Sequence, residues 1–189
     1  IDAGALLKAA RQSGLEGICL TEHQNRWTDA EVKEWSQASG VRIFQGNEIT
    51  TSQGDILVFG LDREVKGVVP IQDLRQEVEA ARGLMIAAHP FRGFLLFGIS
   101  QLQLDVEQAC KRTVFQFVDG LEVLNCKVTA PENDLARRVA DEESAREHWP
   151  AERRGGQEED DHGHEGRAAR DVLPGRGGLR VRHAPSSDI

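Results

Sequence analysis

Short apolar runs alternate with helical patterns along roughly the first 140 residues of the chain. Leu6, Leu7 and Ala10 recur at helical spacing, and Gly14 stands where a helix commonly ends in the left-handed conformation. The next run, from Gly17 to Thr21, is apolar and predicts a buried strand. The pattern then repeats, and it predicts helices over 29–39, 71–82 and 133–140 and strands over 41–46, 55–61, 83–88 and 120–125.

Strands that alternate with helices at this spacing predict a parallel sheet with crossover helices. Ligand sites in such sheets lie at the carboxyl ends of the strands. Polar residues occur where these ends are predicted: His23 follows the first strand, Glu48 the second and His89 the fourth. We therefore expect these three side chains to meet in one site.

The three residues offer nitrogen and oxygen ligands, a set that suits Zn, Mn or Fe. A single His after an apolar strand is commonly a structural residue, and a single Glu after Gly is commonly a helix cap or solvated. Their shared position at the ends of successive strands favours a metal site over these separate explanations. The sequence has no Gly-rich phosphate loop and no nucleophile elbow that would indicate a different chemistry.

Four motifs, in order and with agreeing spacing over about residues 1–140, resemble those of the polymerase-and-histidinol-phosphatase (PHP) family. They are Leu20-Thr21-Glu22-His23, Gly46-Asn47-Glu48-Ile49, Ala88-His89-Pro90-Phe91 and Asp119-Gly120-Leu121-Glu122-Val123-Leu124-Asn125. The resemblance implies a distorted (β/α)7 TIM-like barrel, incomplete in this chain, that holds two or three divalent metal ions. It also implies a metal-dependent phosphoesterase acting on a small phosphorylated metabolite or nucleotide.

The resemblance makes His23, Glu48 and His89 metal ligands. Asp55 stands where many family members carry a liganding His, so it is either a substituted oxygen ligand or a residue at the start of a strand. Arg92 either contacts the phosphate bidentately or is a solvated loop residue.

Three other motif residues are not expected to bind the metal. Glu22 replaces the usual Asp of its motif and is expected to contact the ligands instead. Glu122 and Asn125 face either the pocket or a neighbouring loop.

Two motifs of the family are absent, the opening H-x-H and the closing G-S-D-A-H. The first residue is Ile1 and the helical pattern begins within a few residues, so we expect the natural start to lie upstream. With a partial ligand set, the chain is predicted to be inactive or nearly so. The alternative is a non-catalytic module that serves as a structural platform, like the degenerate copies of this fold attached to DNA polymerases.

The composition changes after Ala140: residues 141–189 hold eight Arg and no Lys, and too few large apolar residues to form a core. We therefore predict a domain over 1–140 and a disordered or poorly ordered tail over 141–189. One hypothesis is that the tail is a frameshifted translation, because a GC-rich gene read out of frame yields such sequence and a shifted frame over 148–154 permits a G-S-D-A-like segment. The alternatives are a natural extension in which His162 and His164 bind metal loosely, and a solvated charged tail.

The overall composition indicates the size of the domain and the kinds of molecule that the protein binds. A chain of 189 residues with 39% hydrophobic content suffices for one domain with a core, and a net charge of -8 argues against a nucleic-acid-binding surface. Cys19, Cys110 and Cys126 show no C-x-x-C spacing, which fits a reducing compartment, and all three are expected to be buried. The sequence shows neither a membrane-spanning run nor a signal peptide, so a cytoplasmic protein with a small phosphorylated substrate is predicted.

Overall fold

The computed structural model of the chain describes residues 2–23, 27–93 and 105–145. From residue 146 on, the predicted tail lies outside the described residues, and so do the hypotheses about its origin and about His162 and His164. None of the helices in the described ranges has both the length and the apolar character needed to cross a membrane.

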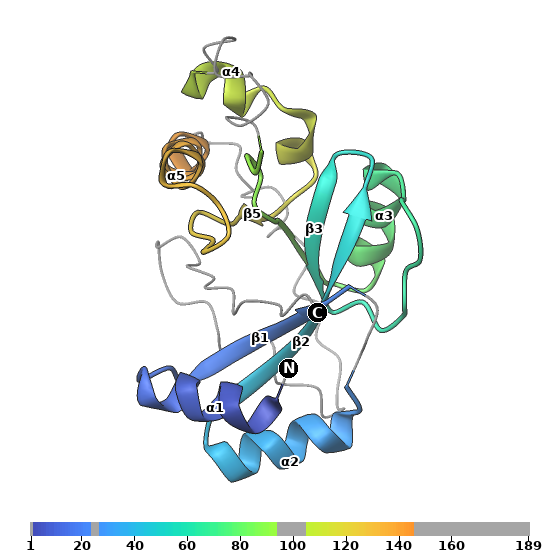
Figure 1. The fold of residues 1–189 in the computed structure, drawn as a ribbon. Coiled ribbons are helices and arrows are strands. Elements are labelled where there is room, and N and C mark those ends of the chain that lie inside the picture. Colours follow the sequence, from blue (N-terminus) through green and yellow to red (C-terminus); the bar gives the residue numbers. More distant parts are fainter. Residues whose placement is uncertain (1, 24–26, 94–104, 146–189) are drawn as a thin grey trace, which may run out of the picture.

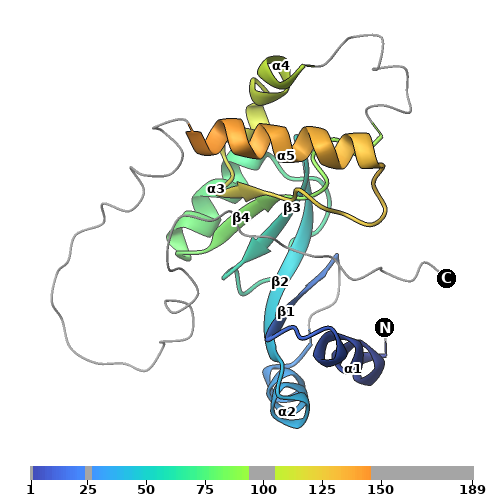
Figure 2. The same cartoon turned by 90° about the vertical axis from the view of Figure 1, so that its left-hand side faces the viewer.

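Within these ranges, five strands form one sheet in the order β1-β2-β3-β4-β5 (Figure 1, Figure 2). They are β1 (Gly17–Glu22), β2 (Arg42–Thr51), β3 (Gly54–Phe59), β4 (Leu84–Ala87) and β5 (Gly120–Leu121). The helices are α1 (Ala3–Gln12), α2 (Asp29–Ser39), α3 (Ile71–Ala80), α4 (Val106–Cys110) and α5 (Ala130–Ala145), with a 3-10 turn at Thr113–Gln116 before β5. The mixed α/β fold predicted from the hydrophobic pattern is therefore confirmed.

One strand runs against the others, so the expectation of an entirely parallel sheet is wrong. The β1–β2 and β4–β5 pairs are parallel, whereas β3 is antiparallel to both β2 and β4. Ser52 and Gln53 alone connect β2 to β3, which is too short for a crossover helix. The Thr51 hydroxyl donates to the Gly54 carbonyl (2.7 Å) and accepts from the Gln53 N–H (3.1 Å), which stabilises this turn.

Some boundaries also differ from the predicted ones. β2 continues beyond Glu48 because the β-branched run Ile49-Thr50-Thr51 pairs with β3. The strand predicted over 120–125 forms a ladder only at Gly120–Leu121, and the short helix α4 was not predicted. α5 continues to Ala145, past the domain boundary predicted at residue 140.

The helices α1, α2, α3 and α5 pack against the same face of the sheet. Ile43 of β2 packs with Leu7 of α1 and Trp35 of α2, and Ile49 of the same strand belongs to the core that includes α3 and α5. Because side chains alternate along a strand, positions 43 and 49 share one face. Figure 2 shows α1 and α2 at one end of the long strand β2 and α3 and α5 at the other.

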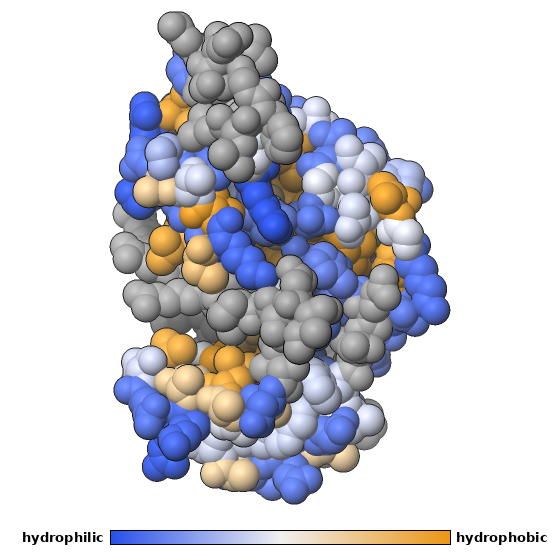
Figure 3. All heavy atoms as spheres, viewed as in Figure 1, coloured by the Kyte–Doolittle hydropathy of each residue, from blue (hydrophilic) through white to orange (hydrophobic). Residues whose placement is uncertain are grey.

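The opposite face carries a smaller apolar cluster, made of Leu57, Ile86 and Ala88 with Phe59 and Leu84 packed against it. Apolar side chains reach the surface where Figure 1 places β1 and β2 (Figure 3). The described strands thus form an open sheet with its helices on one side, and a closed barrel stays a prediction.

The three cysteines differ in their exposure to solvent. Cys110 is buried, whereas Cys19 and Cys126 are exposed. Cys19 pairs with Phe44 in the ladder and so lies on the face opposite the helices. The expectation that all three cysteines are buried is therefore wrong for Cys19 and Cys126.

Candidate metal centre

Three side chains come together on the sheet face opposite the helices. Glu48 of β2, Asp55 of β3 and His89, which follows β4, each offer one ligand atom, and these atoms lie within 4.8 Å of one another. Nε2 of His89 lies 3.0 Å from Oε1 of Glu48 and 3.8 Å from Oδ2 of Asp55. Two neighbouring strands and the segment after β4 thus contribute to one small polar cluster.

The register of the β2–β3 hairpin explains why the two carboxylates meet. Glu48 pairs with Leu57 and Thr50 pairs with Asp55, so all four side chains share one face. Glu48 and Asp55 are diagonal neighbours across the two strands. The turn also returns the chain, so Asp55 lies near the start of β3 and at the same time within the cluster. Asp55 is therefore a residue at the start of a strand, and its role as an oxygen ligand stays a prediction.

Glu48 lies inside β2 rather than after it, so the expectation that it follows a strand end is wrong. Close packing explains the glycine of this motif, Gly46. A Cβ atom at Gly46 would lie 2.7 Å from two ring carbons of Phe59 and 2.7 Å from the carbonyl oxygen of Val58. The absence of a side chain at position 46 therefore lets Phe59 of β3 cross β2 near Glu48.

His23, the residue after β1, contacts Glu48 but is not one of the three residues of the cluster. Its Nδ1 lies 3.2 Å from the main-chain carbonyl oxygen of Glu48, and its Nε2 lies 3.6 Å from Oε2 of the same residue. A carbonyl oxygen only accepts hydrogen bonds, so Nδ1 is the donor in this contact, and Nε2, which faces the Glu48 carboxylate, is the ring atom that would bind a metal. A metal-binding His typically donates its other ring N–H in this way. With 59% of its side chain exposed, against 9% for Glu48, His23 lies at the rim.

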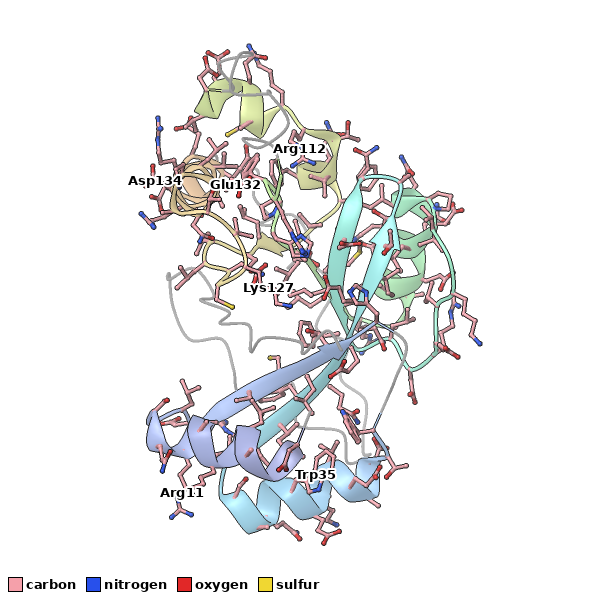
Figure 4. The ribbon with its side chains drawn as sticks, viewed as in Figure 1. Arg11, Trp35, Arg112, Lys127, Glu132 and Asp134 are labelled. Atoms are coloured by element: carbon pink, nitrogen blue, oxygen red, sulfur yellow. The ribbon has the colours of Figure 1, made fainter. Side chains whose placement is uncertain are left out.

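His89 has an unusual backbone conformation. Its φ of 29° lies in the left-handed region that residues other than glycine rarely adopt. The N–H of His89 donates to Oε2 of Glu122 (2.7 Å), and its carbonyl accepts from the N–H of Arg92 (2.9 Å). Arg112 donates to the carbonyl of Pro90, the next residue (Figure 4). Residues held in sparsely populated conformations cluster at functional sites, and several contacts fix this one.

Negative charge surrounds the imidazole of His89. Burial lowers the pKa of His89, but the hydrogen bond with Glu48 and the charges of Glu48, Glu122 and Asp55 raise it, and the net pKa lies above its ordinary value. The surrounding carboxylates therefore favour the protonated form of the metal-free ring.

A divalent cation would balance the same charges, and the spacing of the ligand atoms suits one. Ligands about 2.0–2.2 Å from a tetrahedral ion lie about 3.4 Å from one another. The distances from His89 Nε2 to Glu48 (3.0 Å) and Asp55 (3.8 Å) fall on either side of this value. The donor set present therefore fits a metal ion.

Two residues singled out from the sequence lie away from the cluster. Arg92 is exposed, and within the described ranges its side chain makes no hydrogen bond or ion pair. Glu22 pairs with Asn47 in the ladder and lines an apolar pocket with Trp35 of α2, which Figure 4 labels, so Glu22 lies on the helix face. The expectation that Glu22 contacts the ligands is wrong, because neighbouring positions of a strand point to opposite faces.

Glu122 is the site residue whose role the sequence left open. Only 2% of it is exposed, and both of its carboxylate oxygens accept from Nδ2 of Asn125, at 3.1 and 3.2 Å. The motif around residues 119–125 marked it as a candidate. Its orientation follows from the early end of β5, after which the chain leaves the ladder and Glu122 turns toward His89.

Comparison with known proteins gives few relatives by sequence. No protein-family model matches the chain. An uncharacterised protein from Methanocaldococcus jannaschii is 31% identical over 87 residues, which are 46% of this chain and 50% of that protein. The matching part of the chain therefore spans about half the length of this curated relative.

Solved structures extend the comparison. A proposed metal-dependent phosphoesterase from Bifidobacterium adolescentis matches with a TM-score of 0.55 and 14% identity, over 74% of this chain and 78% of that one. A two-domain protein from Bacteroides vulgatus, containing a predicted PHP-like metal-dependent phosphoesterase, matches with a TM-score of 0.47 and 21% identity, over 69% of this chain and 42% of that one. The likeness to the Bifidobacterium protein shows a shared fold.

Proposed function

We propose that this chain is part of a metal-dependent phosphoesterase of the PHP type. The observation that carries the proposal is the meeting of Glu48, Asp55 and His89, with His23 at the rim, on a fold shared with another proposed metal-dependent phosphoesterase. The proposed substrate is a small phosphorylated metabolite or nucleotide in the cytoplasm.

Glu48, Asp55, His89 and His23 would hold the ion, with Zn, Mn or Fe as the metals that such a set suits. When bound, the ion supplies Lewis acidity, which lowers the pKa of water and neutralises charge on the phosphoryl group. Glu48 acts on both imidazoles, because its carbonyl accepts from His23 and its carboxylate faces His89. Arg92, exposed just after the His89 turn, is proposed to contact the phosphate.

The complete domain is proposed to be a distorted seven-stranded barrel that holds two or three ions. The face carrying Glu48 and Asp55 would then line its interior, because all the long helices lie on the other side. From the candidate ligands that the described residues supply, we expect little or no phosphoesterase activity.

Metal binding by the 189-residue chain tests the proposal. After loading with Zn²⁺ or Mn²⁺ and desalting, elemental analysis should find bound metal in the wild type and much less in His89→Ala, because this variant lacks a direct ligand. The far-ultraviolet circular dichroism should stay unchanged. A double variant, His162→Ala with His164→Ala, is the matched control because it removes two imidazoles of the tail and should retain the metal.

The same experiment separates the catalytic proposal from the structural alternative. A structural platform predicts that His89→Ala lowers the melting temperature and leaves the metal content unchanged. Equal metal content in the wild type and His89→Ala would therefore reject the cluster as the metal site. Loss of metal in the tail variant alone would assign the ion to the tail.

A further inference from the structure

Two carboxylates extend the short pairing between β4 and β5. The N–H of Asp119 donates to the carbonyl of Met85 (2.7 Å), and the N–H of Glu122 donates to the carbonyl of Ala87 (2.9 Å). In the opposite direction, the N–H of Met85 donates to Oδ2 of Asp119 (2.9 Å) and the N–H of His89 to Oε2 of Glu122 (2.7 Å). Side-chain oxygens thus accept where a longer β5 would offer main-chain carbonyls.

Each of these carboxylates is held in place from a helix. Asp119 accepts from Nη1 of Arg75 on α3 (2.8 Å). Glu122 accepts from Asn125, whose main-chain N–H donates to Oδ1 of Asn133 on α5 (2.9 Å) and whose carbonyl accepts from Nδ2 of Asn133 (3.0 Å). A chain of hydrogen bonds therefore runs from α5 through Asn125 and Glu122 to the backbone of His89.

We propose that Glu122 is a positioning residue of the metal centre, which acts by accepting the N–H of His89. The bond holds His89 in its left-handed conformation, and that conformation directs Nε2 toward Glu48 and Asp55. Because Glu122 is 2% exposed, bulk water does not readily replace a lost acceptor there. This inference rests on the proposed function for its consequence, metal binding, but not for the hydrogen bond itself.

Two conservative variants of the full chain separate position from charge. Glu122→Gln retains an oxygen that reaches the N–H of His89 and loses the charge. Glu122→Asp retains the charge, but its shorter side chain withdraws the oxygen from that N–H. If the hydrogen bond positions His89, the Asp variant binds Co²⁺ about 10- to 100-fold more weakly than the wild type, and the Gln variant stays close to the wild type.

Co²⁺ titration followed by visible absorption measures both affinity and ligand geometry. The band pattern should change in Glu122→Asp and persist in Glu122→Gln. Glu132→Gln is the matched control, because Glu132 is also 2% exposed but bonds Thr129 at the start of α5 (Figure 4). Its Co²⁺ spectrum should equal that of the wild type.

The reverse order of affinities, with weak Co²⁺ binding by Glu122→Gln and normal binding by Glu122→Asp, would overturn the inference. It would show that the charge of residue 122 matters rather than the position of its oxygen. An Asp variant that does not fold while the Gln variant does would make Glu122 a purely structural residue, which also overturns it. Equal Co²⁺ binding in all variants would also overturn the inference.

Nuclear magnetic resonance of the metal-free protein distinguishes failure of this inference from failure of the proposed function. The amide proton of His89 should be shifted downfield in the wild type and in Glu122→Gln, and should lose this shift in Glu122→Asp together with a change in the ring nitrogen signals. If the wild type binds no Co²⁺, the proposed function fails, and these signals alone decide the positioning role. Unchanged ring signals in Glu122→Asp would overturn it.

Discussion

Glu48 is the candidate ligand that contacts both imidazoles. Its carbonyl accepts from Nδ1 of His23, and its carboxylate lies 3.0 Å from Nε2 of His89. A residue with 9% of its side chain exposed loses most of its hydration, so these partners must compensate its charge. A proton on the His89 ring, whose pKa is raised, would do so in the metal-free protein, and a cation would do so in the metal-bound one.

The pH dependence of the metal-free protein should reveal this compensation. The pKa of His89 is raised on folding, so the stabilisation by its proton is fully present below the ordinary His value of about 6.5 and is lost as the pH rises through the raised pKa. Urea unfolding in the presence of a chelator should therefore give a free energy of unfolding that falls above about pH 6.5. Glu48→Gln should flatten this fall and lower the pKa of His89, measured by a nuclear magnetic resonance titration. A slope that is the same in both proteins would contradict the assignment.

Gly46 provides a second test at the residue scale. Gly46→Ala places a methyl group 2.7 Å from the ring of Phe59 and from the carbonyl of Val58, so we expect a loss of about 1–3 kcal/mol in the free energy of unfolding. Gly120→Ala is the matched control, because its nearest neighbour, a side-chain carbon of Ile86, lies 3.9 Å away. Equal unfolding midpoints for the two variants would show that Phe59 can move aside.

Among the elements, α2 has a defined cap at each end. The side chain of Thr28 accepts from the N–H of Glu31 (3.3 Å), and the carboxylate of Glu31 accepts from the N–H (2.9 Å) and the hydroxyl (2.6 Å) of Thr28. This is a capping box, and Gly40 ends the helix in the left-handed conformation with a φ of 70°. Local sequence signals therefore mark both ends of α2.

The capping box should make the helix sensitive to acid. Hydrogen bonds from Thr28 hold the pKa of Glu31 below its ordinary value. The stabilisation is then present above the ordinary pKa of a Glu and is lost as the pH falls through the lowered one. Thr28→Ala should cost about 0.5–2 kcal/mol at pH 7 and less at pH 3, as measured by urea unfolding. An equal cost at both pH values would exclude a contribution from the ionised carboxylate.

At the scale of the whole molecule, one face of the sheet forms the main core and the other carries the candidate metal site. One face packs against the helices in a core that includes Leu74 of α3 and Val139 of α5. The other carries the polar cluster of Glu48, Asp55 and His89. Stability and metal binding should therefore respond to different substitutions.

Leu74→Ala tests this separation. The side chain is 2% exposed, so we expect a loss of about 2–5 kcal/mol in the free energy of unfolding. The Co²⁺ affinity of the folded fraction should stay unchanged, because Leu74 packs on the face away from the cluster. Val68→Ala, at a position that is 69% exposed, should change neither quantity. A Co²⁺ affinity that falls in Leu74→Ala under folding conditions would show that the faces are coupled.

Much of the fold was predictable because its signals are local. Helical spacing with a terminal glycine predicted α2 closely, and apolar runs predicted the strands around Ile18, Ile43 and Met85. The hairpin was missed because Ser52 and Gln53 carry no strong turn signal, and only the ladder with β3 shows that β2 continues to Thr51. α4 was missed because it is short and its stability depends on contacts with α5.

The candidate site was predictable in its residues but not in its arrangement. By itself the sequence determined which polar side chains follow or interrupt the apolar runs, since hydrophobic periodicity acts within one segment. Only the tertiary structure decided that β3 reverses direction, that Asp55 faces Glu48 across a hairpin, and that Glu122 reaches the backbone of His89. Those relations depend on the register between segments far apart in the chain, and a shift of one residue would turn each side chain to the other face.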